Sequence, residues 1–514
     1  MRKWSGRGLS VGLGALLSLG VATPSLAQQR APVLPLPSPP AVPPTIAAAG
    51  PDDAAPLRVP QELVQVQPGG ITAEQAGARA AQTSWQAKAS MASLRSAAAL
   101  VDGAWAAFLP RLSALGRYTR LSDFTEPTIP FLPAGDNLVV TSQTGPLKTN
   151  APLFGASVPG FSFPFFVLDN WLFQATLSVP ISDYFLRTNQ NYSAATHSEE
   201  AARWDVVAAR AGSDANGRLA YYAWLNARAA VVVAVEALND QKTHLRDAGN
   251  QFAAGNASKA DVLRAETAVA SAELAVEHTK NLSDLAEKQL RVAIHAGEEE
   301  TLTPGEDVDA PPAPITGNVK QMTAEALSAR PEIRSADANA ASATAQGEAA
   351  KAGRWPTLSA FGDGILGNPN PRYIPPTNVF NTTWDVGAQV TWSPNDILTA
   401  NSSASNIEAR IAAIVANRNA TRDNIEVEVT QMLQNVREAD FSIDSSAREL
   451  ASAEEAYRVA RELFNNGRGT SATLTDAESE LTRSRLDLLN SKFNARTARI
   501  RLEHALGRDA RPSR

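Results

Sequence analysis

The sequence predicts a mainly α-helical fold with a small β part, built from two copies of a helix–strand–strand–helix unit. Three features lead to this prediction: an internal repeat over most of the 514 residues, segments with period-two alternation, and very long helical segments. One hydrophobic core rarely organises a chain of this length, so more than one structural unit is expected.

The first 27 residues are predicted to be a cleaved signal peptide. The positive charges of Arg2, Lys3 and Arg7 precede a short apolar core at residues 9–22, and Ser25-Leu26-Ala27 fits a small-x-small cleavage site. A membrane anchor is the alternative, but this apolar core is shorter than the ~20 residues that span a bilayer. The sequence therefore favours an exported protein.

Proline-rich segments divide the rest of the chain. Residues 28–70 are predicted to be a disordered tether, and residues 306–318 are predicted to link two repeats. The predicted repeats are then residues 71–305 and 319–507, and a C-terminal tail follows at residues 508–514.

The composition argues against several classes of function. A formal net charge of -6 lacks the basic surplus of a nucleic-acid-binding protein. The sequence has no cysteine, which excludes disulfides, thiolate chemistry and lipidation of an N-terminal cysteine. The five histidines are scattered, and Glu298-Glu299-Glu300 is interpreted as a solvated loop. We therefore predict no catalytic, cofactor-binding or metal site, and no enzyme.

The internal repeat rests on five matches that occur in the same order in both halves. The first half also carries an insertion of about 33 residues between the second and third matches. The matched segments are Ile71–Glu74 with Met322–Glu325, Pro110–Gly116 with Pro356–Gly362, Trp171–Asp183 with Trp384–Asp396, Phe252–Gly255 with Phe464–Gly467, and Ala296-Gly297 with Leu506-Gly507.

The strand segments alternate between apolar and polar residues. Such a pattern fits a lipid-facing barrel strand and also a half-buried strand of a soluble sheet, so the strands alone leave both open. A weaker strand begins near Leu112, where Ala114, Gly116 and Tyr118 can share its face. The apolar faces comprise Trp171, Phe173, Ala175, Leu177 and Val179 in the first half, and Trp384, Val386, Ala388, Val390 and Trp392 in the second.

The helical segments favour a long antiparallel stalk. No proline or glycine occurs from Asp396 to Asn465, and a continuous helix of that length would measure ~105 Å. Many seam positions are Ala, Ser or Thr, so the helices can pack closely. The heptad seams run through Ile425, Val429, Met432, Val436, Ala439 and Ile443; through Leu474, Ala477, Leu481, Ser484, Leu488, Ser491, Ala495, Ala498, Leu502 and Ala505; and through Val262, Ala265, Val269, Ala272, Val276, Thr279, Ser283, Ala286, Leu290 and Ala293.

Four strands are too few to close a membrane barrel, because known barrels begin at about eight strands. A four-stranded unit in a membrane must therefore associate with other copies. The sequence supports association without fixing the number of copies.

These features resemble the TolC family of outer-membrane efflux proteins over residues 71–507. The resemblance rests on the duplicated Pro-x-Leu-Ser strand entries, the paired strands, and the glycine-centred turns followed by Asp261-Val-Leu-Arg-Ala265 and Leu474-Thr-Asp-Ala477. It implies a homotrimer with a twelve-stranded β-barrel in the outer membrane of a Gram-negative bacterium, on a long α-helical coiled-coil barrel in the periplasm. It also implies a passive exit duct for a periplasmic adaptor (membrane fusion) protein and an inner-membrane pump, with no catalytic residue or cofactor.

The resemblance carries over two sites. The helix turns match the tips where adaptors dock, although glycines there could simply turn the chain. Asp476, Asp261 and Phe464 match the periplasmic aperture, although both aspartates could simply be helix-start carboxylates. The predicted tip residues are Gly255, Asn256, Ala257, Ser258, Gly467, Arg468, Gly469 and Thr470.

Aromatic residues of the strands are expected to face outer-membrane lipid: Tyr118, Trp171, Phe173, Trp384 and Trp392. Thr473, Phe464 and Gly469 differ from residues that latch the aperture in other family members, so that latch cannot be transferred here. The transported substrate is not encoded in these features, and small molecules are favoured as the family's commonest cargo.

Two other classes of protein share part of the pattern. A trimeric adhesin or structural coiled coil would have the export signal and the heptads but would not need the paired strands. A passive porin would have many more strands and almost no helix.

Overall fold

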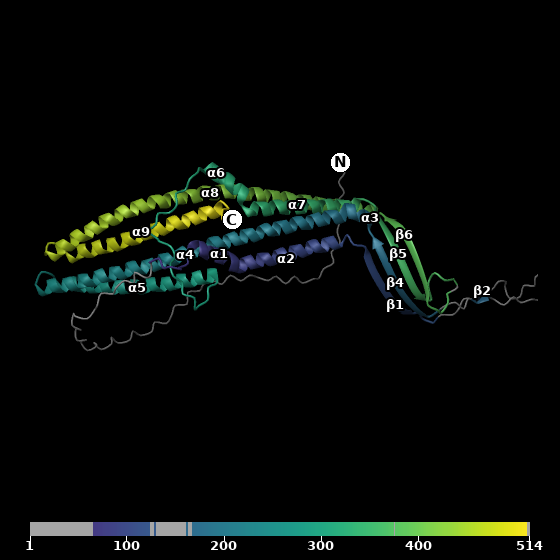
Figure 1. Ribbon diagram of the computed structural model, residues 1–514, viewed down its shortest axis with the longest axis horizontal. Helices are drawn as coiled ribbons and strands as arrows, with labels where there is room; N and C mark the ends of the chain where they lie inside the picture. The colour runs from purple at the N-terminus through teal and green to yellow at the C-terminus, as the bar shows by residue number, and fades with distance from the viewer. Residues whose placement is uncertain (1–64, 124–127, 130–160, 163–166, 375, 511–514) are drawn as a thin grey trace, which may run out of the picture. The chain divides into compact units, whose positions relative to one another are not determined.

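The computed structural model describes residues 65–123, 128–129, 161–162, 167–374 and 376–510 (Figure 1). All described residues belong to one compact unit. The predicted signal peptide, most of the predicted tether and the end of the predicted C-terminal tail lie outside the described residues.

Two repeats with the same order of elements make up this unit, as predicted. The first repeat contains α1 (Ala73–Thr83), α2 (Trp85–Ala106), β1 (Arg111–Arg120), β4 (Asp169–Val179), the short α3 (Ile181–Asp183), the π-helical η2 (Tyr184–Thr188), α4 (Asn189–Ala253) and α5 (Lys259–Ile294). The second contains α6 (Val319–Ala329), α7 (Pro331–Lys351), the 3-10 helix η3 (Ala352–Arg354), β5 (Thr357–Asn368), β6 (Asn381–Thr391), α8 (Pro394–Asn465) and α9 (Ser471–Ala505). Two short strands, β2 (Thr128–Ile129) and β3 (Phe161–Ser162), pair with each other between β1 and β4.

The first of the five repeat matches pairs the wrong residues of the two halves. Thr72 caps α1 through a capping box with Gln75, and Asn318 caps α6 in the same way with Gln321. Thr323, which the sequence paired with Thr72, instead lies inside α6. That match was therefore wrong by five residues, because helix capping and not the shared Thr-Ala-Glu letters defines the equivalent positions.

The last match is also shifted. The left-handed residue that ends α5 is His295, with φ of 52°, whereas Gly507, with φ of 70°, follows α9. His295 is thus the counterpart of Gly507, and the pairing of Gly297 with Gly507 was wrong by two residues. The three inner matches lie at the starts of β1 and β5, within β4 and β6, and at the ends of α4 and α8.

Two long helical hairpins dominate the fold. α4 has 65 residues and α8 has 72, which correspond to about 100 Å each, and α5 and α9 run back along them (Figure 1). Apolar clusters hold each hairpin together, with Val231, Val235 and Val276 between α4 and α5. Ile425 and Leu502 belong to the corresponding cluster of the second hairpin. The predicted seams are confirmed, because every one of their residues is buried or half-buried.

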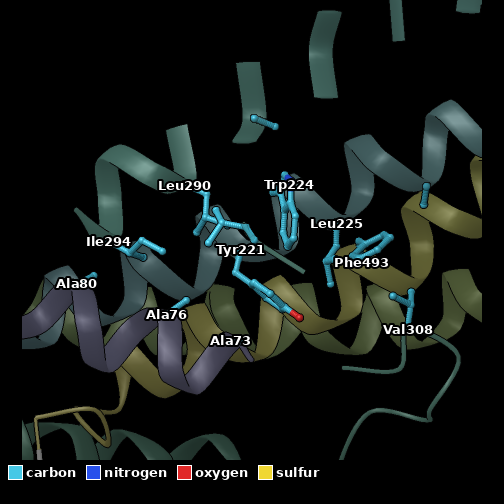
Figure 2. Close-up of a cluster of buried hydrophobic side chains, with 13 residues drawn as sticks. Ala73, Ala76, Ala80, Tyr221, Trp224, Leu225, Leu290, Ile294, Val308 and Phe493 are labelled. Carbon is cyan, nitrogen blue, oxygen red and sulfur yellow. The ribbon is translucent and has the colours of Figure 1, made fainter. Parts of the chain in front are cut away.

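A central core joins the two repeats (Figure 2). Tyr221 and Trp224 of α4 are fully buried there, and Phe493 of α9 packs against the same cluster. Small residues of α1, such as Ala76, allow that helix to lie close to α4. Glu306 of the inter-repeat linker accepts hydrogen bonds from the Tyr222 hydroxyl and the Ala73 backbone, both at 2.6 Å, so the linker is fixed to this core.

We expect Gly217→Val to destabilise this core by about 1–3 kcal/mol. A Cβ atom on Gly217 would lie 2.7 Å from the Ala80 Cβ and 2.8 Å from the Ala76 carbonyl oxygen, so α1 would have to move. Gly212 lies in the same helix with open space around it, and Gly212→Ala should stabilise by about 0.5–1 kcal/mol. Thermal unfolding of the two variants in detergent would test this; equal shifts would contradict the close packing of α1.

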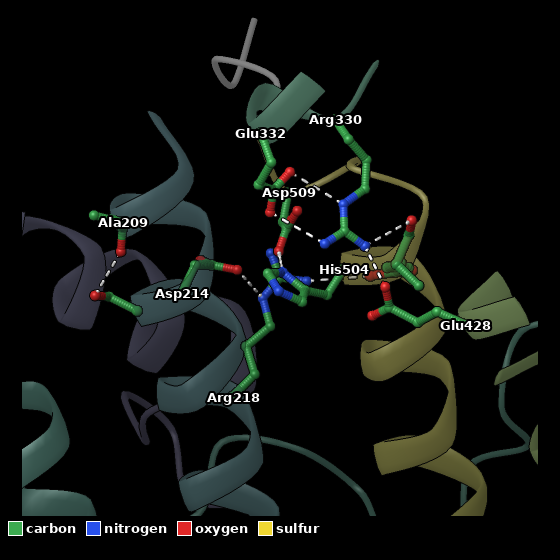
Figure 3. Close-up of polar contacts among 11 residues, drawn as sticks. Ala209, Asp214, Arg218, Arg330, Glu332, Glu428, His504 and Asp509 are labelled. Carbon is green, nitrogen blue, oxygen red and sulfur yellow. Dashed lines mark hydrogen bonds and ion pairs between the residues drawn. The ribbon is translucent and has the colours of Figure 1, made fainter. Parts of the chain in front are cut away.

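Ion pairs surround the break between α6 and α7, where both repeats meet (Figure 3). Arg330 lies 2.7 Å from Glu428 and 3.1 Å from Glu332, and its side chain is largely buried. The Nδ1 atom of His504 lies 2.6 Å from a buried Asp509 carboxylate. This contact ties the end of the described chain to α9.

Stability is expected to depend on pH through His504. The hydrogen bond to Asp509 raises the pKa of His504 above its ordinary value of 6.5, against the effect of burial. A raised folded pKa means that the stabilisation is complete below the unfolded pKa and is lost as pH rises through the folded pKa. His504→Gln should therefore destabilise at about pH 6 and progressively less above about pH 7, in thermal unfolding series. His278→Gln, on an exposed position of α5, is the control, and an unchanged pH profile in His504→Gln would contradict the contact.

The four longer strands form one antiparallel sheet in the order β1-β4-β5-β6. The register places Gly116 opposite Phe173 and Gly364 opposite Trp384. β1 and β6 are the edges of this sheet. The connection between β1 and β4, residues 121–168, is much longer than that between β5 and β6, residues 369–380, in agreement with the predicted insertion.

Candidate functional site

The predicted tip residues all lie in the two turns between the long helices. Gly255 and Gly467 have φ of 78° and 69°, a left-handed conformation that favours glycine, and they end α4 and α8. Ser258 and Thr470 then cap α5 and α9. Since most of the tip residues are exposed, both turns are open to a partner.

The two predicted aperture aspartates occupy different environments. Asp261 closes a capping box, because its Oδ2 accepts hydrogen bonds from the Ser258 hydroxyl at 2.6 Å and the Ser258 backbone N–H at 3.0 Å. These bonds lower the pKa of Asp261. Asp476 is exposed in the second turn of α9, and within the described residues it makes no side-chain hydrogen bond or ion pair. The contacts of Asp261 are therefore those of a helix-start carboxylate, which was the alternative to an aperture role. The carboxylate of Asp476 has no such contact among the described residues and can act on passing ions through its charge.

Phe464, the third predicted aperture residue, joins the two hairpins. It is only 5% exposed and packs in a cluster with Ala248 of α4, Ala265 of α5 and Leu474 of α9, which we call the tip cluster. Its repeat counterpart Phe252 is 45% exposed. Two phenylalanines at equivalent sequence positions thus have different roles.

A buried polar contact that sequence reasoning missed lies beside the tip cluster. His244 of α4 is fully buried with its Nδ1 atom 2.9 Å from an Oε2 of Glu478 in α9. Its Nε2 atom lies 3.3 Å from the Ser471 hydroxyl, and its ring meets the Phe464 ring edge-on at 5.3 Å. The signal available in the sequence was Glu478, a charged residue between the seam positions Leu474 and Leu481.

The two faces of the sheet differ in polarity as the alternation predicted. On one face Trp384 is 75% exposed, Trp392 55%, and Trp171 and Phe173 more than 40%. Tyr118 lies on the same face, with its ring 4.6 Å from that of Trp171. All five predicted lipid-facing aromatics are therefore exposed on one side.

The opposite face of the sheet carries hydrogen-bonding side chains. Gln174 donates to Asp363 at 3.1 Å, and the Thr176 hydroxyl donates to the same carboxylate. Arg372 pairs with Asp385 on this face at 2.5 Å. A sheet with one exposed apolar face and one polar face suits a boundary between lipid and water.

The described residues contain no group of three or more His, Asp or Glu side chains that could hold a metal ion. Among the described helices, none combines the length and apolar character required to cross a membrane.

A profile of the outer membrane efflux protein family matches residues 323–508, which is nearly the whole second repeat. This part of the chain is therefore similar to that family. The predicted location in the outer membrane and the predicted non-enzymatic, transport role agree with it. The first repeat lies outside the match but has the same order of elements.

Solved outer-membrane channels share the fold of this chain. The match with the outer-membrane channel OprN covers 85% of this chain and 89% of the OprN chain, at 18% sequence identity and a TM-score of 0.67. The Campylobacter jejuni CmeC outer membrane channel covers 86% and 89%, at 16% identity and a TM-score of 0.65. The open state of the Neisseria gonorrhoeae MtrE outer membrane channel covers 85% and 88%, at 17% identity and a TM-score of 0.65. No curated protein sequence shows significant similarity to the chain.

These comparisons confirm the predicted fold class and the resemblance to the TolC family. The fold has the paired strands that an adhesin would not need, and it has far more helix than expected of a porin.

Proposed function

We propose that three copies of this chain form the exit duct of a tripartite efflux or secretion system. The duct passively conducts substrates, small molecules being the favoured class, from an inner-membrane pump and a periplasmic adaptor protein to the exterior. The protein itself supplies no energy and needs no cofactor.

The observation that carries the proposal is a small sheet with two open edges and an exposed apolar face. β1 and β6 present backbone hydrogen-bonding groups at the two edges of the sheet. Four strands cannot enclose a lumen, but three copies joined edge to edge would give twelve strands. The exposed tryptophans would then face lipid, and the polar face with Gln174 and Asp363 would line the lumen.

The long helices support association in the same way. α5 and α8 expose large apolar side chains away from the seams of their own hairpins, such as Leu274 at 73% and Phe441 at 68% exposed. In a single chain these side chains lie in water, whereas a neighbouring copy would cover them. The helices of three copies would continue the lumen below the sheet.

The exposed tips fit the proposed adaptor contact, and Asp476 fits a ring at the periplasmic aperture. Three carboxylates around a narrow opening would raise the local negative potential and favour cations. Asp261 contributes to the same region mainly by fixing the start of α5. Phe464 contributes by holding the hairpins together.

The proposed aperture predicts a change in ion selectivity in Asp476→Asn. Removal of three charges should lower the ratio of cation to anion permeability by roughly twofold or more. Reversal potentials under a salt gradient across a planar bilayer would measure this ratio. Asp444→Asn, an exposed substitution in α8 away from the turns, is the control and should leave the ratio unchanged.

Purified protein in a planar bilayer also tests the proposed function as a whole. Discrete conductance steps are expected from the reconstituted protein, and expression in cells that lack their own exit duct should restore drug efflux when a pump and adaptor are present. Protein that folds but neither conducts nor restores efflux would contradict the proposal.

A further inference from the structure

A groove of about 370 Å³ lies in the part of the helical region next to the sheet, where α7 packs against both α4 and α8 (Figure 1). Ala336 and Ala343 of α7 and Ile414 of α8 give it an apolar lining on one part of its wall. Its hydrogen-bonding side chains include Asn339, Gln346, Arg410, Asn417 and Arg418. We call it the arginine groove. Its volume is sufficient for a small organic molecule.

The charge of the arginine groove has one sign. Its charged lining residues are Arg410 and Arg418, and none of the described residues that line it is acidic. Arg418 is held by Asp337, whose carboxylate lies 2.7 Å away. Arg410 is exposed, and its side chain makes no hydrogen bond or ion pair with any described residue. Its guanidinium can therefore offer two parallel N–H groups to a ligand, a geometry that matches a carboxylate.

Two amide side chains of α7 add donors beside the guanidinium. Asn339 donates one hydrogen bond to Ser335 at 3.5 Å, and Gln346 donates one to Ser342 at 3.3 Å. These contacts within the helix orient both amides, and each amide nitrogen keeps a second N–H that can donate to a ligand. A molecule with an anionic group and a small apolar part therefore matches the lining better than a cation does.

The arginine groove opens on the side of the molecule that carries the polar face of the sheet. A second groove, of about 350 Å³, is lined by Ser403 of α8, which lies two helical turns before Arg410 and so on the same helix face. Thr357 and Thr391, which pair across β5 and β6, also line this second groove. Thr391 belongs to the polar face by alternation with Val390. In the proposed duct, this side of the chain is the lumen.

We propose that the arginine groove binds small organic carboxylates, with Arg410 holding the carboxylate and Ile414 and the alanines contacting the apolar part. The placement of the groove in the lumen rests on the proposed function, whereas the binding itself does not. In the duct, each of three copies would hold such an anion on the wall, so carboxylate-bearing molecules would be the favoured cargo.

The charge at the proposed aperture does not oppose this binding. The stretch of α8 from Arg410 to Phe464, beside the tips, is about 80 Å long. Screening by salt acts over about 10 Å, so Asp476 and Arg410 influence a passing molecule at separate points. The second groove carries one charge of each sign, Arg187 and Asp396, and leaves the positive charge of the arginine groove unbalanced.

A pair of probes of the same shape tests the carboxylate site. 4-Fluorobenzoate and 4-fluorobenzamide share a ring and differ in charge near neutral pH. Their binding to the purified full chain in an uncharged detergent is followed by the broadening of the fluorine-19 NMR signal, with the broadening in empty micelles subtracted. We expect the parent protein to bind the carboxylate at least about fivefold more tightly than the amide. Arg410→Gln should weaken carboxylate binding about tenfold and leave amide binding unchanged.

Two further variants separate the geometry of the site from its charge. Arg422→Gln removes an exposed arginine of the same helix that lines neither groove, and it should leave both affinities unchanged. Arg410→Lys keeps the charge but cannot form two parallel hydrogen bonds, so it should retain only part of the preference for the carboxylate. Thermal unfolding should be the same for all variants, because both arginines are exposed.

Equal affinity of the parent protein for the two probes would overturn the carboxylate site, and so would an unchanged carboxylate affinity in Arg410→Gln. Carboxylate binding through Arg410 in a protein that does not conduct in bilayers would support the site and count against the proposed duct. A conducting protein without the preference would overturn the site and leave the duct standing.

Discussion

Val386→Arg is expected to prevent stable insertion of the protein into a membrane. Val386 is 74% exposed on the apolar face of β6, and its neighbours on that face are Trp384 and Ala388. An arginine facing lipid near the bilayer midplane costs about 2–4 kcal/mol. In a trimer this cost applies three times. The total is comparable to the whole free energy of unfolding of a typical domain.

Gln389→Arg is the matched control, since it introduces the same side chain three residues away on the polar face of the same strand. Folding into lipid vesicles can be followed by the mobility shift between heated and unheated samples on a gel. We expect Val386→Arg to stay unfolded or unbound to the vesicles, whereas Gln389→Arg should fold. Similar folding of the two variants would show that the apolar face does not contact lipid.

Phe464→Ala is expected to loosen the tips far more than Phe252→Ala, although the two residues occupy equivalent positions in the repeats. Phe464 is buried against His244 and Leu474, and removal of a buried phenylalanine side chain costs about 3–5 kcal/mol. Phe252 is 45% exposed, so its removal should cost less than about 1 kcal/mol. Hydrogen exchange of the helix ends next to both turns, measured by mass spectrometry, would compare the variants. Equal protection in both would contradict the packing of the tip cluster.

The long helices and their seams could be predicted from sequence because they depend on residues close to one another along the chain. The proline- and glycine-free stretch from Asp396 to Asn465 and the small residues at heptad positions determine helix length and packing without reference to the rest of the chain. The strand faces were predictable for the same reason, since alternation alone separates Trp384 and Val386 from Asp385.

The features that sequence reasoning missed depend on which segments meet in space. His244 and Glu478 are 234 residues apart, and no pattern along the chain shows that α4 and α9 face each other at that height. The unequal burial of Phe252 and Phe464 has the same origin, because only Phe464 points into the contact between hairpins. The two wrong repeat matches have another cause. They were chosen by identical residues in the two halves, whereas the equivalent positions are defined by the capping role of Asn318 and the left-handed conformation of His295.

In the proposed duct, one chain supplies one part of a closed wall made of several copies. Native mass spectrometry of the detergent-extracted protein would determine the number of copies. We expect a particle with three times the mass of a single chain, which dissociates to single chains only on denaturation. A folded single chain, or a soluble particle that needs no detergent, would contradict it.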